Sequence, residues 1–323
     1  GPFVRAAFVA AGRSAFAFTG SRGCFPGAVR AAAFFPGLSA RLAVPLPRGA
    51  VSNPANVRLQ RAGADVPLQT KPVGYWPDGS IMWLLLTFPP EAGAVTGAAG
   101  AGDALEFEVT RRDGSREDYT LLYGGDCAAG TPADALTASV PDGVVRINTG
   151  PLQLELAAEE GWLRQATLNG REMLSAPAGS FVDFLRTDDT YASMTTHPAG
   201  KRDPGAFVPE TIELEEAGPL RAVVKLTGMT TAQDSPRMVL RVEAYAGRSC
   251  VRVEQSVEFL TPDPRVAFVR RMGLELPLVD ASGEVTAGGQ DGPVTLTGGR
   301  RAGLRQHSHL GYTAWNQDEG EAF

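Results

Sequence analysis

Residues 250–259 read Cys-Val-Arg-Val-Glu-Gln-Ser-Val-Glu-Phe, and apolar and polar side chains alternate along most of the segment. A period of two puts Val251, Val253, Val257 and Phe259 on one face, as in a half-buried antiparallel strand. Residues 238–245 alternate in the same way, and the linker Ala-Gly-Arg-Ser between the two segments has turn chemistry. The stretch therefore predicts a β-hairpin.

The same pattern recurs through the second half of the chain, and no stretch combines a helical period with a cap before it and a glycine after it. Many short strands at turn spacings are typical of a β-sandwich or barrel. The expected elements are a hairpin of residues 211–215 and 220–226, a hairpin of residues 144–156 and 163–168, a tight turn at Asn169-Gly170, and strands at 266–276 and 294–296.

The first half also predicts strands, with more proline and glycine between them. They are expected at residues 38–46, 57–60, 66–70, 81–88, 105–110 and 118–122, with 66–70 at a sheet edge because of Pro67. Residues 124–139 are small and rich in turn formers, so we interpret them as a domain boundary.

Composition excludes several classes of protein. A 43% share of hydrophobic residues is ordinary for a folded chain, and no apolar run approaches the ~20 residues of a membrane helix. The formal net charge of −6 argues against nucleic-acid binding through bulk charge. Cys24, Cys127 and Cys250 are widely spaced and have no paired Cys or His pattern, so no zinc site is predicted.

Residues 1–36 consist mostly of alanine, glycine, phenylalanine and arginine without a clear period. We expect a poorly ordered or non-native leader there and leave it out of the fold prediction, because disorder concentrates at termini. No signal segment is identified in it.

Three segments together carry a family resemblance. They are Val44-Pro45-Leu46-Pro47-Arg48-Gly49, the run Tyr75-Trp76-Pro77-Asp78-Gly79-Ser80 with the aliphatic strand after it, and Gly218-Pro219-Leu220-Arg221-Ala222. With residues 240–247, these segments resemble the exo-rhamnogalacturonan lyase-like family of polysaccharide lyases. The resemblance covers residues 38–323, and the Trp-Pro-Asp-Gly-Ser run is its most specific part.

The resemblance implies an all-β fold, in which a small N-terminal β-barrel of the RIFT type is followed by an antiparallel β-sandwich. We place the barrel at residues 37–125 and the sandwich at residues 126–323. In the family a large α/α-toroid follows, and this chain ends where the toroid would begin. We therefore expect the β-domain portion of a lyase-like enzyme, inactive by itself, whose helical domain is its partner within the same protein.

The resemblance further implies β-elimination on a uronate-containing polysaccharide of the rhamnogalacturonan or pectin type, outside the cell or in the periplasm. Such a reaction needs a cation against the uronate carboxylate and groups that take and return a proton. We expect no cofactor, no metal ion, no nucleic acid and no membrane partner.

Two segments, 191–203 and 300–315, hold the residues suited to this chemistry, including all three histidines of the chain, and residues 191–203 show no strand alternation. We interpret residues 191–203 as a long loop. The catalytic candidates are His197, Lys201, His307, His309 and Tyr312, and the substrate-binding candidates are Tyr191, Arg202, Arg305 and Trp315.

Plainer interpretations stay open beside these. His197 could be a surface residue, and His307 and His309 could bind a metal ion, although no third ligand is visible. Trp76 and Trp83 are expected to pack the barrel, with sugar stacking by Trp76 or Tyr75 as the alternative. The whole chain could also be a non-catalytic carbohydrate-binding or scaffolding module, or an interaction module without a sugar ligand.

Overall fold

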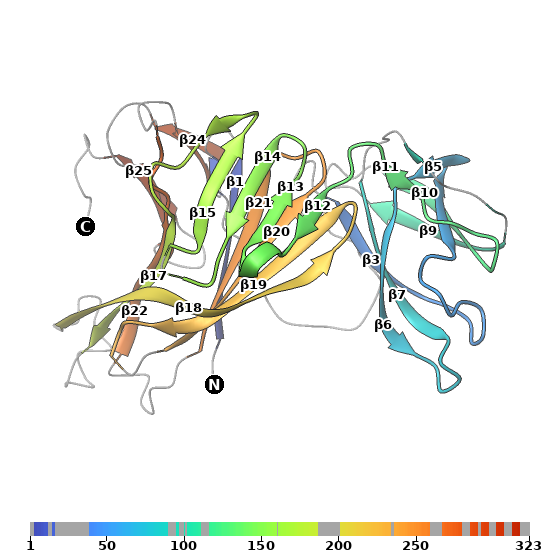
Figure 1. Ribbon diagram of the computed structural model, residues 1–323, viewed down its shortest axis with the longest axis horizontal. Helices are drawn as coiled ribbons and strands as arrows, with labels where there is room; N and C mark the ends of the chain where they lie inside the picture. The colour runs from blue at the N-terminus through green and yellow to red at the C-terminus, as the bar shows by residue number, and fades with distance from the viewer. Residues whose placement is uncertain are drawn as a thin grey trace.

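The computed structural model describes residues 3–11, 15–16, 39–89, 95–96, 100, 102–110, 116–159, 161–186, 201–233, 236–258, 267–279, 285–289, 292–296, 302–306 and 312–316. Within these residues the regular structure is β-strand apart from one 3-10 turn, η1 (Pro141–Gly143), and no α-helix occurs. The all-β prediction is therefore confirmed. Figure 1 shows a barrel-like unit on the right and a larger sandwich on the left.

The N-terminal unit is built from two small sheets wrapped around one core. One sheet has the order β3–β7–β6 and the other the order β5–β4–β10–β9. Phe88, Leu59 and Leu121 from both sheets are fully buried between them. The strand bounds are β3 (Ala40–Pro45), β4 (Val57–Arg61), β5 (Ala64–Val66), β6 (Gln69–Tyr75), β7 (Ile81–Phe88), β9 (Asp103–Thr110) and β10 (Arg116–Tyr123).

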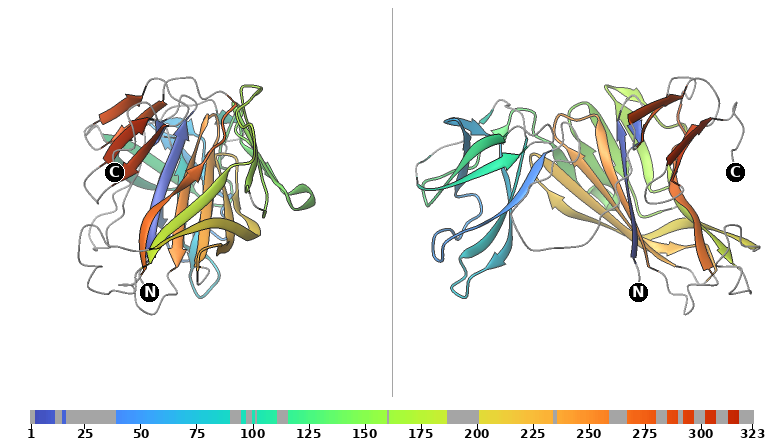
Figure 2. Two further views of the ribbon diagram at one scale, coloured as in Figure 1. Left: turned by 90° about the vertical axis from the view of Figure 1, so that its left-hand side faces the viewer. Right: turned by 180° about the vertical axis from the view of Figure 1, so that it is seen from behind.

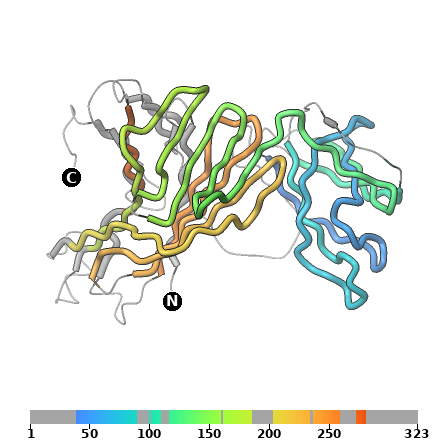
Figure 3. The backbone as a smooth tube through the Cα atoms, in the orientation of Figure 1, coloured from blue at the N-terminus to red at the C-terminus, as the bar shows by residue number. Residues whose placement is uncertain are grey.

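A link leads from the barrel to the sandwich, as the tube in Figure 3 shows. It contains β11 (Thr131–Pro132), which pairs with β8 (Val95–Thr96), and then β12 (Thr137–Ser139). Leu68 N–H donates to the Gly130 carbonyl at 2.8 Å, so the link lies against the barrel before it enters the sandwich.

The sandwich packs a five-stranded sheet, in the order β12 to β16, on a ten-stranded sheet. Trp162, Val224 and Leu240 are among the residues buried between the sheets. Bounds in the smaller sheet are β13 (Val145–Asn148), β14 (Leu152–Leu156), β15 (Leu163–Leu168) and β16 (Arg171–Glu172). The larger sheet runs β22 (Ala267–Glu275), β17 (Gly179–Arg186), β18 (Lys201–Ala217), β19 (Arg221–Thr230), β20 (Arg237–Tyr245), β21 (Cys250–Glu258), β1 (Phe3–Ala11), β2 (Ala15–Phe16), β23 (Val285–Gly289) and β24 (Gly292–Leu296).

The larger sheet curls on itself. Gln255 on β21 points into the core, and its Nε2 donates to Ser180 Oγ on β17 and to the Gly273 carbonyl on β22, the latter at 3.1 Å. Three strands separate β21 from β17 in the sheet order, so these contacts require the sheet to bend across its own core. The bend makes this unit a half-barrel closed by the smaller sheet.

The hairpin that decides the fold is confirmed: β20 pairs antiparallel with β21, and Val242 lies opposite Val253. The tight turn at Asn169-Gly170 is also confirmed, because both residues have positive φ and join β15 to β16. Two expected strands are wrong in their bounds. Residues 144–156 form two strands, because Gly150 with φ 101° and Pro151 turn the chain between them.

Residues 66–70 form no single edge strand. Val66 ends β5 and Gln69 begins β6, while Pro67 makes an isolated bridge to Gly130. Proline has no N–H to continue a ladder, so the chain changes sheets at this point.

Residues 3–11, which the sequence analysis leaves out of the fold, form β1. This strand pairs antiparallel with β21 over its whole length, from Phe3 opposite Glu258 to Ala11 opposite Cys250. Figure 2 shows it from behind, beside β21. The remaining short hairpin pairs β25 (Ala302–Gln306) with β26 (Tyr312–Asn316).

Candidate functional site

The structure describes five of the nine predicted site residues. Tyr191, His197, His307 and His309 lie outside the described residues. Lys201 and Arg202 begin β18, so this end of the segment 191–203 is strand and the loop prediction is wrong for it. Because Lys201 and Arg202 are neighbours in a strand, their positions face opposite sides of the sheet.

The other three predicted residues lie on the β25–β26 hairpin. Arg305 is opposite Thr313, and Trp315 is opposite Gly303, so Arg305 and Trp315 occupy positions on the same face. Tyr312 is opposite Gln306 and therefore belongs to the other face. The register thus groups two of the four proposed substrate-binding residues and separates them from the proposed catalytic Tyr312.

A hollow of about 280 Å³ lies on the face of β19–β21 that points away from the core. Each of the three strands supplies two lining residues, which are Lys225 and Thr227, Arg237 and Val239, and Ser256 and Glu258. We call this feature the outer hollow. Two cations, one carboxylate and two hydroxyls surround one aliphatic side chain, a lining that could hold a polar ligand with hydroxyls and a negative charge.

Ion pairs continue along the same face toward the barrel. Lys225 Nζ lies 3.5 Å from Glu213 and 3.6 Å from Glu215. Arg241 holds Glu215 with two hydrogen bonds, of 2.8 and 3.0 Å. Hydrogen bonds from the Arg241 guanidinium lower the pKa of the Glu215 carboxyl below its usual value. Partial burial raises this pKa, but by less. Lys225 therefore faces anions on one side and the outer hollow on the other.

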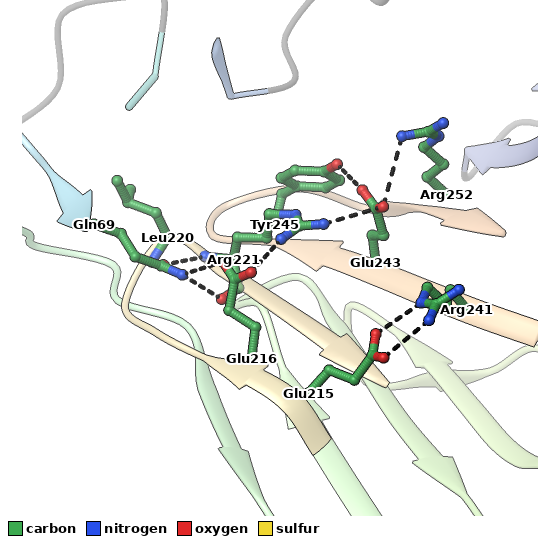
Figure 4. Close-up of polar contacts among 9 residues, drawn as sticks. All are labelled: Gln69, Glu215, Glu216, Leu220, Arg221, Arg241, Glu243, Tyr245 and Arg252. Carbon is green, nitrogen blue, oxygen red and sulfur yellow. Dashed lines mark hydrogen bonds and ion pairs between the residues drawn. The ribbon is translucent and has the colours of Figure 1, made fainter. Parts of the chain in front are cut away.

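Where this face meets the barrel, five residues form a buried polar cluster, which we call the joint cluster. Its members are Gln69, Glu216, Arg221, Glu243 and Tyr245, shown in Figure 4. Arg221 contacts Glu216 at 2.6 Å and Glu243 at 3.0 Å, and Tyr245 Oη donates to Glu243 at 2.6 Å.

The barrel side chain Gln69 is hydrogen-bonded into the joint cluster, and Arg41 of β3 interacts with its charges. The Gln69 carboxamide oxygen accepts from the backbone N–H groups of Leu220 and Arg221, at 3.0 and 2.8 Å. Its Nε2 donates to Glu216 at 2.6 Å and to the Arg221 carbonyl at 3.1 Å. Gly218 leaves room for this side chain, because a Cβ there would lie 2.1 Å from Gln69 Cδ. Gln69 thus fastens the barrel to the β18–β19 turn.

The charged side chains of the joint cluster stabilise one another in their ionised forms. Burial opposes the charge of Arg221, but Glu243 and Glu216 more than offset it and raise the pKa of this guanidinium. Burial likewise opposes the charge of Glu243, yet Arg221 and the Tyr245 hydroxyl keep its pKa below the usual value. Because the cluster is buried, we interpret it as a structural fastening rather than as a catalytic site.

We expect Gln69→Ala to lower the free energy of unfolding by about 2–6 kcal/mol, because two buried N–H donors lose their acceptor at about 1–3 kcal/mol each. Denaturant unfolding measures the loss, and hydrogen exchange of the Leu220 and Arg221 amides should accelerate. Gln60→Ala is the matched control, since Gln60 is half-buried in the barrel and its side chain makes one hydrogen bond within the described residues, to Asp65 at 3.2 Å. Equal losses in both variants would refute the fastening role.

The aromatic residues around the barrel turn do not all pack its core. Trp83 is 38% exposed and Tyr75 59% exposed, so the prediction that Trp83 packs the barrel interior is wrong. Trp76 is half-buried, and its Nε1 donates to the Leu46 carbonyl at 3.1 Å. The turn itself is held by Asp78, whose pKa is lowered to about 2 by hydrogen bonds from the Ser80 hydroxyl, from Arg48 and from the Ser80 N–H.

Sequence reasoning missed both the outer hollow and the joint cluster. The sequence does contain a signal for the outer hollow, because strand alternation places Thr227, Val239 and Ser256 on the face away from the core. The joint cluster had none, since Gln69 and Arg221 are 152 positions apart.

The described residues hold neither a metal-ligand cluster nor a helix fit to span a membrane. No group of three or more His, Cys, Asp or Glu side chains there is arranged to hold a metal ion. In the same part of the chain, no helix has the length and apolar character needed to cross a membrane.

Comparison with known protein families matches both units in chain order. Residues 35–99 match the description "PcRGLX-like N-terminal RIFT barrel domain", and residues 137–285 match "PcRGLX-like protein central beta sandwich domain". The chain belongs to the PcRGLX-like family. The barrel and the sandwich expected from the sequence motifs are therefore the first and second domains of this family.

The chain is also similar to a distant curated relative. The chain is 21% identical over 216 residues to a Bacillus subtilis (strain 168) protein named "Uncharacterized protein YetA". The match covers 65% of this chain and 22% of YetA, so the chain spans about a fifth of the length of that relative.

Proposed function

We propose that this chain is the β-domain portion of a polysaccharide lyase-like enzyme that cleaves uronate-containing polysaccharide, of the rhamnogalacturonan or pectin type, by β-elimination. The observation that carries the proposal is the match of two successive PcRGLX-like domains in the order barrel, then sandwich. The match covers 22% of YetA, which supports a longer protein around this chain.

The reaction assigns distinct tasks to side chains. A cation neutralises the uronate carboxylate, a base removes the proton beside it, the electron pair forms a carbon–carbon double bond, and the glycosidic oxygen leaves and is protonated. We propose Arg202 and Arg305 for the carboxylate, with Trp315 and Tyr191 stacking on sugar rings. His197, Lys201, His307, His309 and Tyr312 remain the candidates for proton transfer.

The proposed reaction also implies what the enzyme binds and where it acts. Its partners are an acidic polysaccharide or oligosaccharide and a helical domain of the same protein, which completes the substrate cleft. Because such a polymer is too large to diffuse across a membrane, we propose an extracellular or periplasmic location.

The test compares this chain with the longest natural protein that contains it, each incubated with rhamnogalacturonan, polygalacturonate and a neutral galactan. Ultraviolet absorbance of the unsaturated uronate follows elimination. We expect absorbance to rise only with the longer protein and only on the uronate polymers, and to fall in its Arg305→Ala and His307→Ala variants. No rise with any polymer would contradict the proposal.

The alternative is a non-catalytic carbohydrate-binding or scaffolding module. One observation favours it for the described residues, because they include no histidine while the outer hollow offers Lys225 and Arg237. Polysaccharide retention by the longer protein without unsaturated product would support this alternative.

A further inference from the structure

The outer hollow is separate from both the joint cluster and the nine predicted site residues. None of its six lining residues belongs to either group, and all of them lie in strands β19, β20 and β21. Paired strands hold their side chains at fixed spacings, so the hollow is formed by rigid structure rather than by loops.

The strand register orders the lining residues in rows. Thr227, Val239 and Ser256 are directly opposite one another and form the middle row. Arg237 and Glu258 are opposite each other in the next row, and Lys225 lies on the other side of the middle row. Positions two residues apart on a strand are about 7 Å apart, so the cations stand on either side of a hydroxyl–aliphatic–hydroxyl row.

Most polar groups in the hollow are available to a ligand. Within the described part of the chain, the side chains of Thr227, Arg237, Ser256 and Glu258 make no hydrogen bond or ion pair with other side chains, although their backbones pair in the sheet. Lys225 differs, because Glu213 and Glu215 lie near its ammonium. Arg237 is therefore the cation best able to accept a new carboxylate, and its planar fork suits that group.

We propose that the outer hollow binds a sugar acid, a single ring that carries one carboxylate and several hydroxyls. The carboxylate pairs with Arg237, the hydroxyls bond to Thr227, Ser256 and Glu258, and a C–H face of the ring lies on Val239. The volume of about 280 Å³ is near the lower end of ligand pockets, roughly 300 Å³, so it suits one ring rather than a length of polymer. The choice of a uronate as the ligand rests on the proposed function, because the polymer proposed there contains uronates. The outer hollow would add a uronate-binding position on the sandwich.

The test titrates this chain with galacturonate and with galactose while nitrogen-15 NMR follows the backbone amides. We expect galacturonate to shift the amides of Thr227, Val239 and Ser256, and to bind at least about tenfold more tightly than galactose, the gain of one well-formed charge-assisted pair. Arg237→Ala should weaken galacturonate binding by about tenfold. Ser256→Ala keeps every charge and should weaken it by about threefold.

Arg146→Ala is the matched control, because Arg146 is an exposed arginine on the smaller sheet, paired with Glu155. It should bind galacturonate as the unchanged chain does. The inference is overturned if galacturonate leaves the three amides unshifted, if galactose binds as tightly, or if Arg237→Ala binds unchanged. These readouts need no cleavage, so binding can fail while elimination succeeds, and the reverse.

Discussion

Replacing Arg221 with methionine is expected to lower the free energy of unfolding by about 3–5 kcal/mol, because it strips a buried cation from two carboxylates. The Arg221 side chain is only 4% exposed, and Glu243 is 6% exposed, so water cannot take over the lost interaction. Glu243 would keep the hydrogen bond from the Tyr245 hydroxyl, but the cation nearest to it would be Arg252, whose guanidinium lies 3.6 Å away. Denaturant unfolding of the variant and the unchanged chain measures the difference.

The pH dependence gives this prediction a second readout. In the unchanged chain the pKa of Glu243 is lowered, so its contribution to stability is present above its unfolded pKa and is lost as the pH falls through the folded pKa. In Arg221→Met this carboxyl loses the charge that lowers its pKa most, so its folded pKa should be higher than in the unchanged chain and its charged form less favourable. The deficit of the variant should therefore shrink as the pH falls.

Arg241→Met is the control for both readouts. Arg241 carries out the same kind of pairing with Glu215 on the same face, but its side chain is 33% exposed. Exposed pairs contribute about 0–1 kcal/mol, so the control should lose far less stability. A loss in Arg221→Met no larger than in the control, at every pH, would show that the joint cluster does not hold the fold.

Replacing Trp162 with alanine is expected to cost about 3–5 kcal/mol, the usual result of removing a buried aromatic side chain. Trp162 is 1% exposed and packs in the core between the two sheets of the sandwich. Trp162→Phe is the matched variant. The indole Nε1 has no hydrogen-bond partner within the described residues, so phenylalanine loses packing volume without breaking a polar contact.

We therefore expect Trp162→Phe to lose clearly less stability than Trp162→Ala in the same denaturant titration. Equal losses in the two variants would contradict this account, since they would show that the indole nitrogen, rather than the ring volume, matters. A loss below about 1 kcal/mol in Trp162→Ala would mean that the two sheets are not closely packed around this residue.

The sequence pattern predicted those strands and turns that are determined by neighbouring residues. The hairpin β20–β21 follows from alternating valines joined by a turn around Gly247, whose φ is 67°. The prediction failed where proline changes the path of the chain, as at Pro151 and Pro67. It also failed at residues 201–203, whose polar side chains show no alternation although their backbone pairs with β17.

The candidate sites were harder to predict, because they depend on tertiary contacts. The outer hollow requires the register of three strands, and alternation reveals only which face each residue occupies. The joint cluster requires Gln69 to meet the β18–β19 turn, which no local signal encodes. The predicted histidines lie outside the described residues, so their roles stay predictions.

The most direct measurement of the central claim is the mass of the products released from rhamnogalacturonan by the longest natural protein that contains this chain. Elimination gives an oligosaccharide that is one water molecule lighter than the product of hydrolysis, with a double bond in its terminal uronate. The account predicts these lighter products. Intact polymer, or hydrolysed products alone, would contradict it.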